Sequence, residues 1–419
     1  METISRRRFL QLTGGAVVAS QTVPMWLRLG PAGASPGPAQ GRKLLVVLLN
    51  GGNDGLNTVI PYGMGAYHDA RPGIRYSPEE VLTLPGNTEV GLNPSLAALH
   101  RLYGEDKVAV VQGVGYDQPT LSHFDSMDVW QSGDPTLATT TGWLGRYLDR
   151  SPAGPGSVIR AVAIGNELPL ALRGEAESGV AIPSYSGFRF YDGSDGDPTS
   201  EPYRLHEAYL GCTDAPLGGR PAEALLTASA RTVTAVRAVN EMADPKAKPP
   251  RTLAEQVGLA LGLLRSDLGV EVAFVTLGGF DTHAAEQSSH PALLAELDAA
   301  VGHFTTEVAK TPNPGDYLLM TFSEFGRRVT ENGAGGTAGT DHGTAAPLFV
   351  VGDAVAGGLY GEHPRLDAAG LDENGNLIRT VELREVYSTI IEGWLGGATA
   401  AEVLDTRPAH GLAPVPFLP

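Results

Sequence analysis

The chain has 419 residues, a formal net charge of −17 and one cysteine, Cys212. The acidic balance excludes non-specific nucleic-acid binding, because few cations are left to neutralise phosphates, and the lone cysteine excludes an internal disulfide. No stretch approaches the roughly eighteen uninterrupted apolar residues of a membrane span. We therefore expect no membrane span in the mature chain and a single large domain over residues 42–419.

The N-terminal segment has the order of a twin-arginine signal peptide. Arg6 and Arg7 are followed two positions later by Phe9, then by a mild apolar stretch over residues 13–20 and an A-x-A cleavage site at residues 32–34. Removal of residues 1–34, which carry four arginines and one glutamate, changes the net charge to −20. Residues 35–41 form a Pro/Gly-rich linker. We expect the twin-arginine machinery to export the folded protein to the periplasm or beyond.

Short continuous apolar runs predict buried strands of a parallel sheet. They are residues 43–49, 107–112, 158–164, 270–277, 317–322 and 348–351. Apolar residues at three- and four-residue spacing between most of these runs predict helices. The helical segments are residues 92–103, 122–132, 221–242, 252–268, 291–310 and 381–395, the last capped by Thr380. The alternation predicts an α/β fold with a doubly wound, mostly parallel central sheet and helices on both faces.

One segment interrupts this alternation. Residues 168–203 are rich in glycine, serine, aspartate and aromatic residues. Two interpretations are open: a cap over the sheet, and a long ordered surface loop.

Metal-type ligands follow several of the predicted strands. In open α/β sheets, ligands bind beyond the carboxyl ends of the strands, and carboxylates and imidazoles are what a divalent ion such as Zn²⁺ or Mn²⁺ requires. The candidates are Asp54, Asp281, His283, Glu324, Asp341 and His342. A residue of this kind standing alone is more often a turn or cap residue, but together the candidates predict a site for one or two ions. His363 or His410 is a candidate for a late additional ligand.

Two further residues are candidates for catalysis. Ser122 begins a predicted helix, where its hydroxyl is well placed to attack phosphorus or sulfur. The alternative is that Ser122 is only an N-cap, with Asp125 completing a capping box. Arg327 is expected to clamp an oxyanion, or to form a surface ion pair. The other histidines, His290 among them, are expected to be ordinary surface or core residues.

The motifs resemble the alkaline phosphatase superfamily and, more closely, an exported bacterial branch of unknown function, domain-of-unknown-function family 1501. The matching pieces are LNGGNDGLNTVIPY from Leu49, SHFDSMDVW from Ser122, TGWLGRYLD from Thr141, LPLALRG from Leu168, GGFDTH from Gly278, SEFGRRVTENG from Ser323 and GTDHG from Gly339. The resemblance implies metal ligands at Asp54, Asp281 and His283 and a nucleophile at Ser122. The remaining Asp-His position falls on Glu324 by strand order and on Asp341-His342 by residue type.

The resemblance implies an exported metal-dependent hydrolase of phosphate or sulfate esters, acting on a small molecule or a polymer through a covalent seryl intermediate. The residues around Cys212 lack the sulfatase signature, which disfavours a formylglycine sulfatase. The alternative function is a non-catalytic periplasmic or cell-surface binding protein that retains the fold. A phosphomutase using the same serine is the third hypothesis.

Overall fold

The computed structural model describes residues 41–185, 188, 234–236, 238–242, 248–404 and 412–418. Several sequence predictions lie outside these residues: the signal peptide, nearly all of the linker, Cys212, His410, and most of the segments 186–203 and 221–242.

Among the described residues, nine strands form one central sheet in the order β13-β5-β12-β9-β1-β8-β6-β7, with β14 also pairing with β5. The strands are β1 (Lys43–Asn50), β5 (Val108–Gly115), β6 (Ala161–Ile164), β7 (Val180–Ile182), β8 (Val272–Gly278), β9 (Tyr317–Phe322), β12 (Ala346–Val351), β13 (Gly358–Tyr360) and β14 (Val381–Glu382). Every pairing is parallel except those of β12. All six predicted strands are present, and the mostly parallel α/β fold is confirmed.

The antiparallel direction of β12 follows from its connection. After β9 the chain forms a separate hairpin of β10 (Arg327–Asn332) and β11 (Gly339–His342), and then enters β12. Between β9 and β12 no helix carries the chain back to the end of the sheet at which the parallel strands begin. β12 therefore runs antiparallel to its neighbours β9 and β5.

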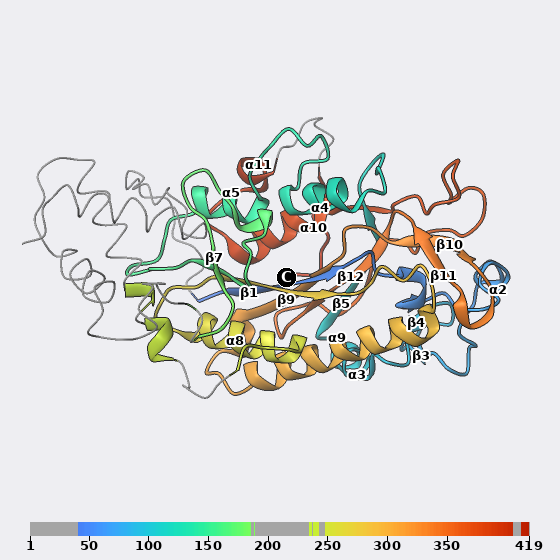
Figure 1. Ribbon diagram of the computed structural model, residues 1–419, viewed down its shortest axis with the longest axis horizontal. Helices are drawn as coiled ribbons and strands as arrows, with labels where there is room; N and C mark the ends of the chain where they lie inside the picture. The colour runs from blue at the N-terminus through green and yellow to red at the C-terminus, as the bar shows by residue number, and fades with distance from the viewer. Residues whose placement is uncertain are drawn as a thin grey trace, which may run out of the picture.

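Helices cover both faces of the sheet (Figure 1). One layer consists of α3 (Ala97–Gly104), α8 (Leu253–Arg265) and α9 (Glu286–Val308), and the other contains α4 (His123–Ser132), α5 (Trp143–Arg150), α10 (Leu383–Ser388) and α11 (Ala400–Val403). Alternate side chains of β1 belong to two different cores: Leu45 and Val47 pack with the first helix layer, and Leu44 and Val46 pack with the second. This two-residue period explains the continuous apolar run, since both faces of the strand are buried.

A third, smaller core lies beside the carboxyl ends of the strands. It includes residues of the 3₁₀ turn η1 (Gly55–Asn57), of β2 (Val59–Ile60) and of α2 (Gly65–Ala70). β2 belongs to a small three-stranded sheet with β3 (Leu82–Thr83) and β4 (Gly91–Leu92). The remaining short turns are η2 (Leu170–Leu172), η3 (Pro314–Asp316) and η4 (Gly335–Thr337).

Three predicted helices begin elsewhere. The helix predicted over residues 92–103 begins at Ala97, because Leu92 pairs with Val59 and Leu82 as part of β4. The helix predicted over residues 381–395 starts two residues later, because Val381 pairs with Val114 as part of β14. Its cap is Glu382, which forms a capping box with Glu385, rather than Thr380, and the helix continues from α10 into the π-helical turn η5 (Thr389–Leu395). α9 begins five residues before the predicted start, so Pro291 lies inside it.

The described part of the segment 168–203 extends the sheet. Val180, Ala181 and Ile182 form β7 and pair in parallel with β6. Residues 180–182 therefore form an edge strand rather than a cap, and residues 186–187 and 189–203 of the segment lie outside the described residues.

The carboxyl ends of three central strands meet at one edge. Asn50 of β1 is in register with Gly278 of β8, and Leu48 is in register with Phe322 of β9. The loops that follow these strands therefore start side by side, and they carry most of the predicted ligands. Among the described helices, none combines the length and hydropathy that crossing a membrane requires.

Candidate metal centre

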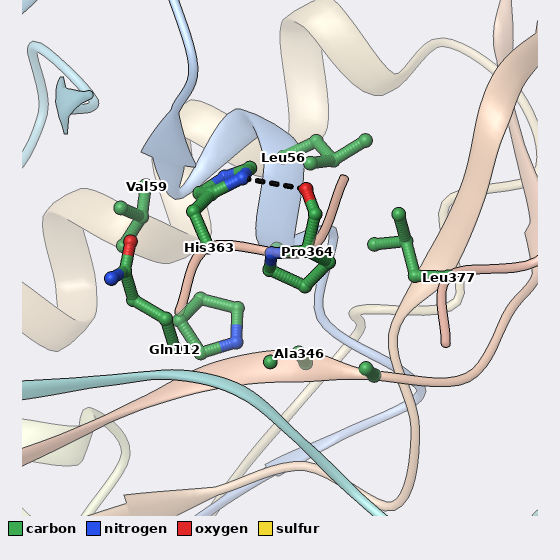
Figure 2. Close-up of a pocket in the computed structure, with 11 residues that line it drawn as sticks. Leu56, Val59, Gln112, Ala346, His363, Pro364 and Leu377 are labelled. Atoms are coloured by element: carbon green, nitrogen blue, oxygen red, sulfur yellow. Dashed lines mark hydrogen bonds between the residues drawn. The ribbon is translucent and has the colours of Figure 1, made fainter. Parts of the chain in front are cut away.

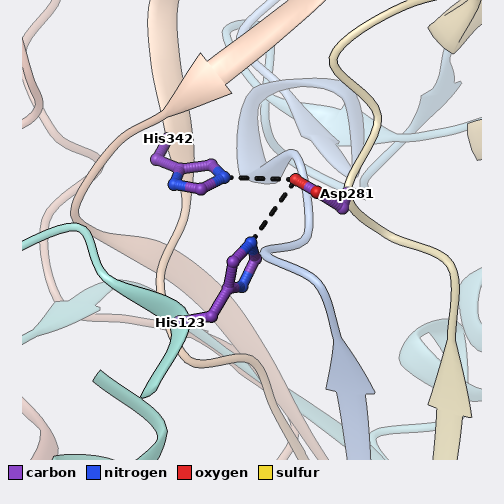
Figure 3. A group of neighbouring side chains, drawn as sticks. All are labelled: His123, Asp281 and His342. Carbon is purple, nitrogen blue, oxygen red and sulfur yellow. Dashed lines mark hydrogen bonds and ion pairs between the residues drawn. The ribbon is translucent and has the colours of Figure 1, made fainter. Parts of the chain in front are cut away.

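Three histidines and one aspartate from separate segments meet beyond this edge of the sheet. His123 is the first residue of α4, Asp281 and His283 follow β8, and His342 is the last residue of β11. Figure 3 shows His123 and His342 approaching the Asp281 carboxylate from different elements. One ligand atom from each of His123, Asp281 and His342 lies within 4.8 Å of the other two.

The Asp281 Oδ1 atom is the common point of the cluster. It lies 3.0 Å from Nε2 of His283, 3.1 Å from Nε2 of His342 and 3.6 Å from Nε2 of His123. Donor atoms around a tetrahedral ion with bonds of about 2.0–2.1 Å are separated by about 3.3 Å. The distances from Asp281 Oδ1 to the three nitrogens are therefore close to those between ligand atoms of one ion of the size of Zn²⁺.

The Nδ1 atom of each imidazole forms a hydrogen bond with an oxygen atom of the protein. Nδ1 of His123 lies 2.9 Å from Oε1 of Glu324, and Nδ1 of His342 lies 2.9 Å from the carbonyl oxygen of Leu121. Nδ1 of His283 lies 3.3 Å from Oδ1 of Asp341. Carbonyl and carboxylate oxygens only accept hydrogen bonds, so Nδ1 is the donor in all three of these contacts, and Nε2 is the ring atom that a bound cation would meet.

This arrangement of tautomers fits a bound cation. Nε2 of His283 and Nε2 of His342 lie 3.0 Å apart, and both face the Asp281 carboxylate. Neutral imidazoles in this orientation would direct three lone pairs toward one another, which is repulsive unless a proton or a metal ion lies between them. Oxygen acceptors behind ligating histidines are also the usual support of metal sites.

A buried aromatic ring supports two of the imidazoles. Phe325 is 1% exposed, and its ring centroid lies 4.9 Å from that of His123 and 4.6 Å from that of His342. The opposite side of the cluster is open, since the side chains of Asp281 and His283 are 47% and 44% exposed. The centre is thus rigid on the protein side and accessible from solvent.

Arg327 holds this centre together from the inside. Its side chain is fully buried and donates to the carbonyl oxygens of Gly51, Gly52, Phe280 and Thr340, and to Oδ1 of Asp281 at 2.7 Å. The expected oxyanion clamp is therefore not what the structure shows, because this guanidinium has no exposed face.

The charge on Asp281 is strongly favoured by its neighbours. Burial raises the pKa of its carboxyl, but hydrogen bonds from Arg327 and His342 and the charge of Arg327 outweigh this effect and lower the pKa to about 2. A hydrogen bond from Asn332 lowers the pKa of Asp341 in the same way. Both carboxylates are therefore ionised at neutral pH.

Glu324 and Asp341 lie one layer behind the donor atoms. The Glu324 side chain is 0% exposed, and Oε1 accepts from Gly51 N at 2.8 Å as well as from His123. Of the two candidates for the ambiguous Asp-His position, the structure brings His342 to the centre and uses Glu324 and Asp341 to orient histidines.

Asp54 takes no part in the cluster. It is fully buried and paired with Arg71 of the segment after α2, with Arg71 Nη1 2.5 Å from Oδ2 and Nη2 3.0 Å from Oδ1. Asp54, expected as a ligand, thus forms an internal ion pair. The spacing of residues in the sequence did not indicate its partner, Arg71.

Ser122 has the position expected of an N-cap. It precedes α4, and its side chain accepts a long hydrogen bond of 3.5 Å from Asp125 N. The half-buried hydroxyl belongs to the residue next to His123, so it lies on the segment that delivers one imidazole to the centre.

Sequence reasoning did not identify His123 as part of the site. The residue stands inside the quoted segment SHFDSMDVW, as the second residue of the helix predicted over residues 122–132. The available signal was its position at the start of a helix that follows the carboxyl end of β5. No comparable sequence pattern indicated that Phe325 or the Leu121 carbonyl belongs to the site.

A small, mostly apolar pocket lies apart from this cluster, between η1 and β12 (Figure 2). Its walls include Leu56, Gln112 and Ala346, together with His363. Nδ1 of His363 donates to the carbonyl oxygen of Pro364 at 2.8 Å, and burial lowers the pKa of this imidazole. His363 is therefore a wall residue of this pocket and is not brought to the cluster.

Comparison with known proteins gives one family. No curated protein matches the chain. Solved structures that it resembles include a protein in the alkaline phosphatase superfamily from Vibrio parahaemolyticus, with 9% identity, 85% of this chain and 71% of that chain covered, and a TM-score of 0.33. The alkaline phosphatase of the Antarctic bacterium TAB5 has 12% identity, coverages of 75% and 93%, and a TM-score of 0.27. The PsFucS1 sulfatase from Pseudoalteromonas sp. has 12% identity, coverages of 85% and 68%, and a TM-score of 0.31. The model of the family DUF1501, described as a protein of unknown function, matches residues 121–392, more than half of the sequence, and the chain therefore belongs to this family.

Proposed function

We propose that the protein is a metal-dependent hydrolase of phosphate or sulfate esters, with His123, Asp281, His283 and His342 as ligands of a divalent cation. One observation carries the metal: three imidazoles, each fixed through Nδ1, direct Nε2 at the ionised carboxylate of Asp281. Three nitrogens and one oxygen suit zinc or manganese. The ester class comes from the resemblance of the sequence to the alkaline phosphatase superfamily.

A bound cation would supply a Lewis acid that polarises the ester and stabilises negative charge on its oxygens. The chain itself supplies orientation. Glu324, Asp341 and the Leu121 carbonyl fix the three rings, and Arg327 fixes Asp281. The exposed side of the cluster admits the substrate.

Ser122 remains our candidate nucleophile. Its hydroxyl would lose its proton and form a bond from Oγ to phosphorus or sulfur, while the bond to the departing alcohol breaks and the alcohol oxygen takes up a proton. Water would then cleave the seryl ester and release phosphate or sulfate. Its place on the residue before His123 supports this role, and the weak cap bond leaves the hydroxyl available.

The test combines metal content with turnover. Wild-type protein and Asp281→Asn are purified from the exported fraction, analysed for metals and assayed with aryl phosphate and aryl sulfate esters. We expect bound metal and hydrolysis of one ester class in wild type, and loss of both in the variant. Asp353→Asn is the matched control, since Asp353 is exposed and pairs with Lys107 on the surface. Absence of metal from wild type, even after titration, would reject the proposal.

A pair of Ser122 variants separates the nucleophile from the cap. Ser122→Ala removes both roles, whereas Ser122→Asn keeps a side-chain oxygen able to cap α4. We expect both variants to retain metal and lose turnover, with only Ser122→Ala losing about 1 kcal/mol of stability. Full turnover in Ser122→Asn would exclude the seryl intermediate.

The structure also offers an observation for the second candidate function. The hydroxyl of Ser122 already serves as an N-cap, and Arg327 has no exposed face for an oxyanion. A binding protein that retains the metal would have these features. Metal binding without turnover of any ester would favour this function over the hydrolase.

We further propose export by the twin-arginine pathway, on the basis of the N-terminal sequence alone. The test is the location of the full chain in cells when Arg6 and Arg7 are both replaced by lysine. We expect retention in the cytoplasm, whereas Arg8→Lys, outside the pair, should leave export unchanged.

A further inference from the structure

We infer that the centre holds a single metal ion, and that Asp54 serves as the permanent partner of Arg71 rather than as a ligand of a second ion. The inference rests on the proposed function for the presence of a metal and goes beyond it by fixing the number of ions. Both charges of the pair are enclosed in the protein, since the side chains of Asp54 and Arg71 are 0% exposed.

The oxygen atoms of Asp54 are already occupied. Oδ2 accepts from Nη1 of Arg71, and Oδ1 accepts from Nη2 of Arg71 and from Leu56 N at 3.2 Å. A two-pronged contact of this kind places the positive charge of the guanidinium where a cation would approach the carboxylate.

Arg71 is itself fixed in place. Its Nε atom donates to the carbonyl oxygen of Val329 at 2.8 Å, and Nη2 donates to that of Arg328 at 2.7 Å. These backbone acceptors belong to β10, so the guanidinium is tied to a strand as well as to Asp54. Moving it aside for a metal ion would leave a buried cation without its partners, which is costly.

The nearest other carboxyl group adds no ligand either. Glu286 is 1% exposed, and its oxygens accept from Asn57 Nδ2 at 3.0 Å and Thr340 Oγ1 at 2.7 Å. Burial and the charge of Asp54 raise the pKa of Glu286 to about 9, so it is neutral at pH 7. Asp54 and Arg71 then cancel each other, and no net negative charge remains for a second divalent ion.

The buried side chains of Asp54, Arg71 and Glu286 lie directly behind the metal centre. Thr282, between Asp281 and His283, donates to Glu286 at 3.4 Å, and Thr340, two residues before His342, donates to the same carboxyl. Glu286, whose carboxyl also interacts with Asp54, thus links the Asp54–Arg71 pair to the segments that carry the ligands.

The test is the stoichiometry of Zn²⁺ binding by the purified mature protein, from calorimetric titration and elemental analysis. We expect one equivalent in wild type and none in Asp281→Asn. In Asp54→Asn, Arg71 would lose its buried counter-charge, and we expect this variant to fold poorly for that reason. The paired variant Asp54→Asn, Arg71→Met removes both charges and should bind one equivalent with a Kd within about threefold of wild type.

A second measurement needs no variant. Crystals of the wild-type protein soaked in Zn²⁺ should give one anomalous peak, among His123, Asp281, His283 and His342, and none at Asp54. Two equivalents in wild type, a second peak at Asp54, or loss of the ion in a folded paired variant would overturn the inference while leaving the metal-dependent hydrolase intact. Absence of any Zn²⁺ from wild type would overturn both.

Discussion

Glu324 illustrates at the scale of one residue how the centre is oriented without direct ligation. The Oε1 atom of its carboxylate accepts hydrogen bonds from Nδ1 of His123 and from the backbone N of Gly51. Glu324→Gln keeps the shape but removes the charge that makes the imidazole a stronger ligand. We expect Zn²⁺ affinity to fall about 10–100-fold, measured by calorimetric titration. An unchanged affinity would show that His123 is not a ligand. The control is Glu105→Gln, because Glu105 is the C-cap of α3, its side chain is exposed and it pairs with Arg101.

Leu121 provides a second case, in which a backbone atom does the positioning. Its φ of +58° is in the left-handed region, and this conformation accompanies the bond from Nδ1 of His342 to its carbonyl oxygen. Leu121→Val should lose about 1–2 kcal/mol of stability, since β-branched residues tolerate this region poorly, and should weaken Zn²⁺ binding. Leu121→Gly, which adopts the conformation freely, should keep the affinity of wild type.

Leu137 is the matched control for that prediction. Its φ is +54°, and its side chain is 44% exposed, but its backbone makes no bond to the centre among the described residues. Leu137→Val should lower stability by a similar amount and leave Zn²⁺ binding unchanged. Equal losses of affinity in both valine variants would mean that strain alone, rather than the contact with His342, accounts for the effect.

The composition of the centre was only partly predictable from the sequence. Asp281, His283 and His342 were expected as ligands, and the structure brings them together because their loops leave the same edge of the sheet. Asp54 also follows a strand at that edge, but its partner Arg71 comes from a segment whose approach depends on the packing of α2 against β10. Such tertiary contacts leave no pattern in a single sequence.

At the scale of elements, the first residue of α9 joins several segments in one buried network. Glu286 contacts Asn57 of η1 and Thr340 of β11, beside the Asp54–Arg71 pair. Burial first, and then the charge of Asp54, raise its pKa from the ordinary value of 4.5 to about 9. The folded protein therefore binds one more proton than the unfolded chain between these values, and stability falls as the pH rises through this range.

His290, one turn further along α9, opposes this effect at lower pH. Burial lowers the pKa of its imidazole from 6.5 to about 4, so its contribution to stability increases as the pH rises to 6.5 and is then constant. The window from pH 6.5 to 9 thus isolates Glu286. Glu286→Gln cannot titrate, and we expect it to gain stability over wild type by up to about 1.4 kcal/mol per pH unit in that window. Denaturant unfolding at several pH values measures this gain, and parallel curves for the two proteins would contradict it.

The elements themselves were largely predictable, because a strand buried on both faces gives a continuous apolar run. β1, β8 and β9 each follow this pattern, and all six predicted strands belong to the central sheet. The direction of β12 was not encoded in its own residues, since it depends on the hairpin that precedes it. The sequence pattern likewise predicts a helical conformation for Val381. The residue is extended because it pairs with Val114 of β5.

At the scale of the whole molecule, the centre joins parts of the chain that are far apart in sequence. His123 lies at the start of a helix in one layer, Asp281 and His283 follow a central strand, and His342 ends a separate hairpin. Unfolding separates these segments, so the unfolded chain cannot reproduce the site. A ligand that binds only the folded state stabilises it by about 2.7 kcal/mol at a free concentration 100 times its Kd.

We therefore expect the free energy of unfolding of the mature protein to rise by about this amount when Zn²⁺ is added at that concentration, and to fall again with a chelator. Denaturant unfolding followed by circular dichroism measures the difference. Asp281→Asn should unfold at the same denaturant concentration with and without Zn²⁺, whereas Asp353→Asn should respond as wild type does. A Zn²⁺-dependent shift that persists in Asp281→Asn would place the stabilising ion elsewhere, because Oδ1 of Asp281 lies within 3.6 Å of all three Nε2 atoms of the cluster.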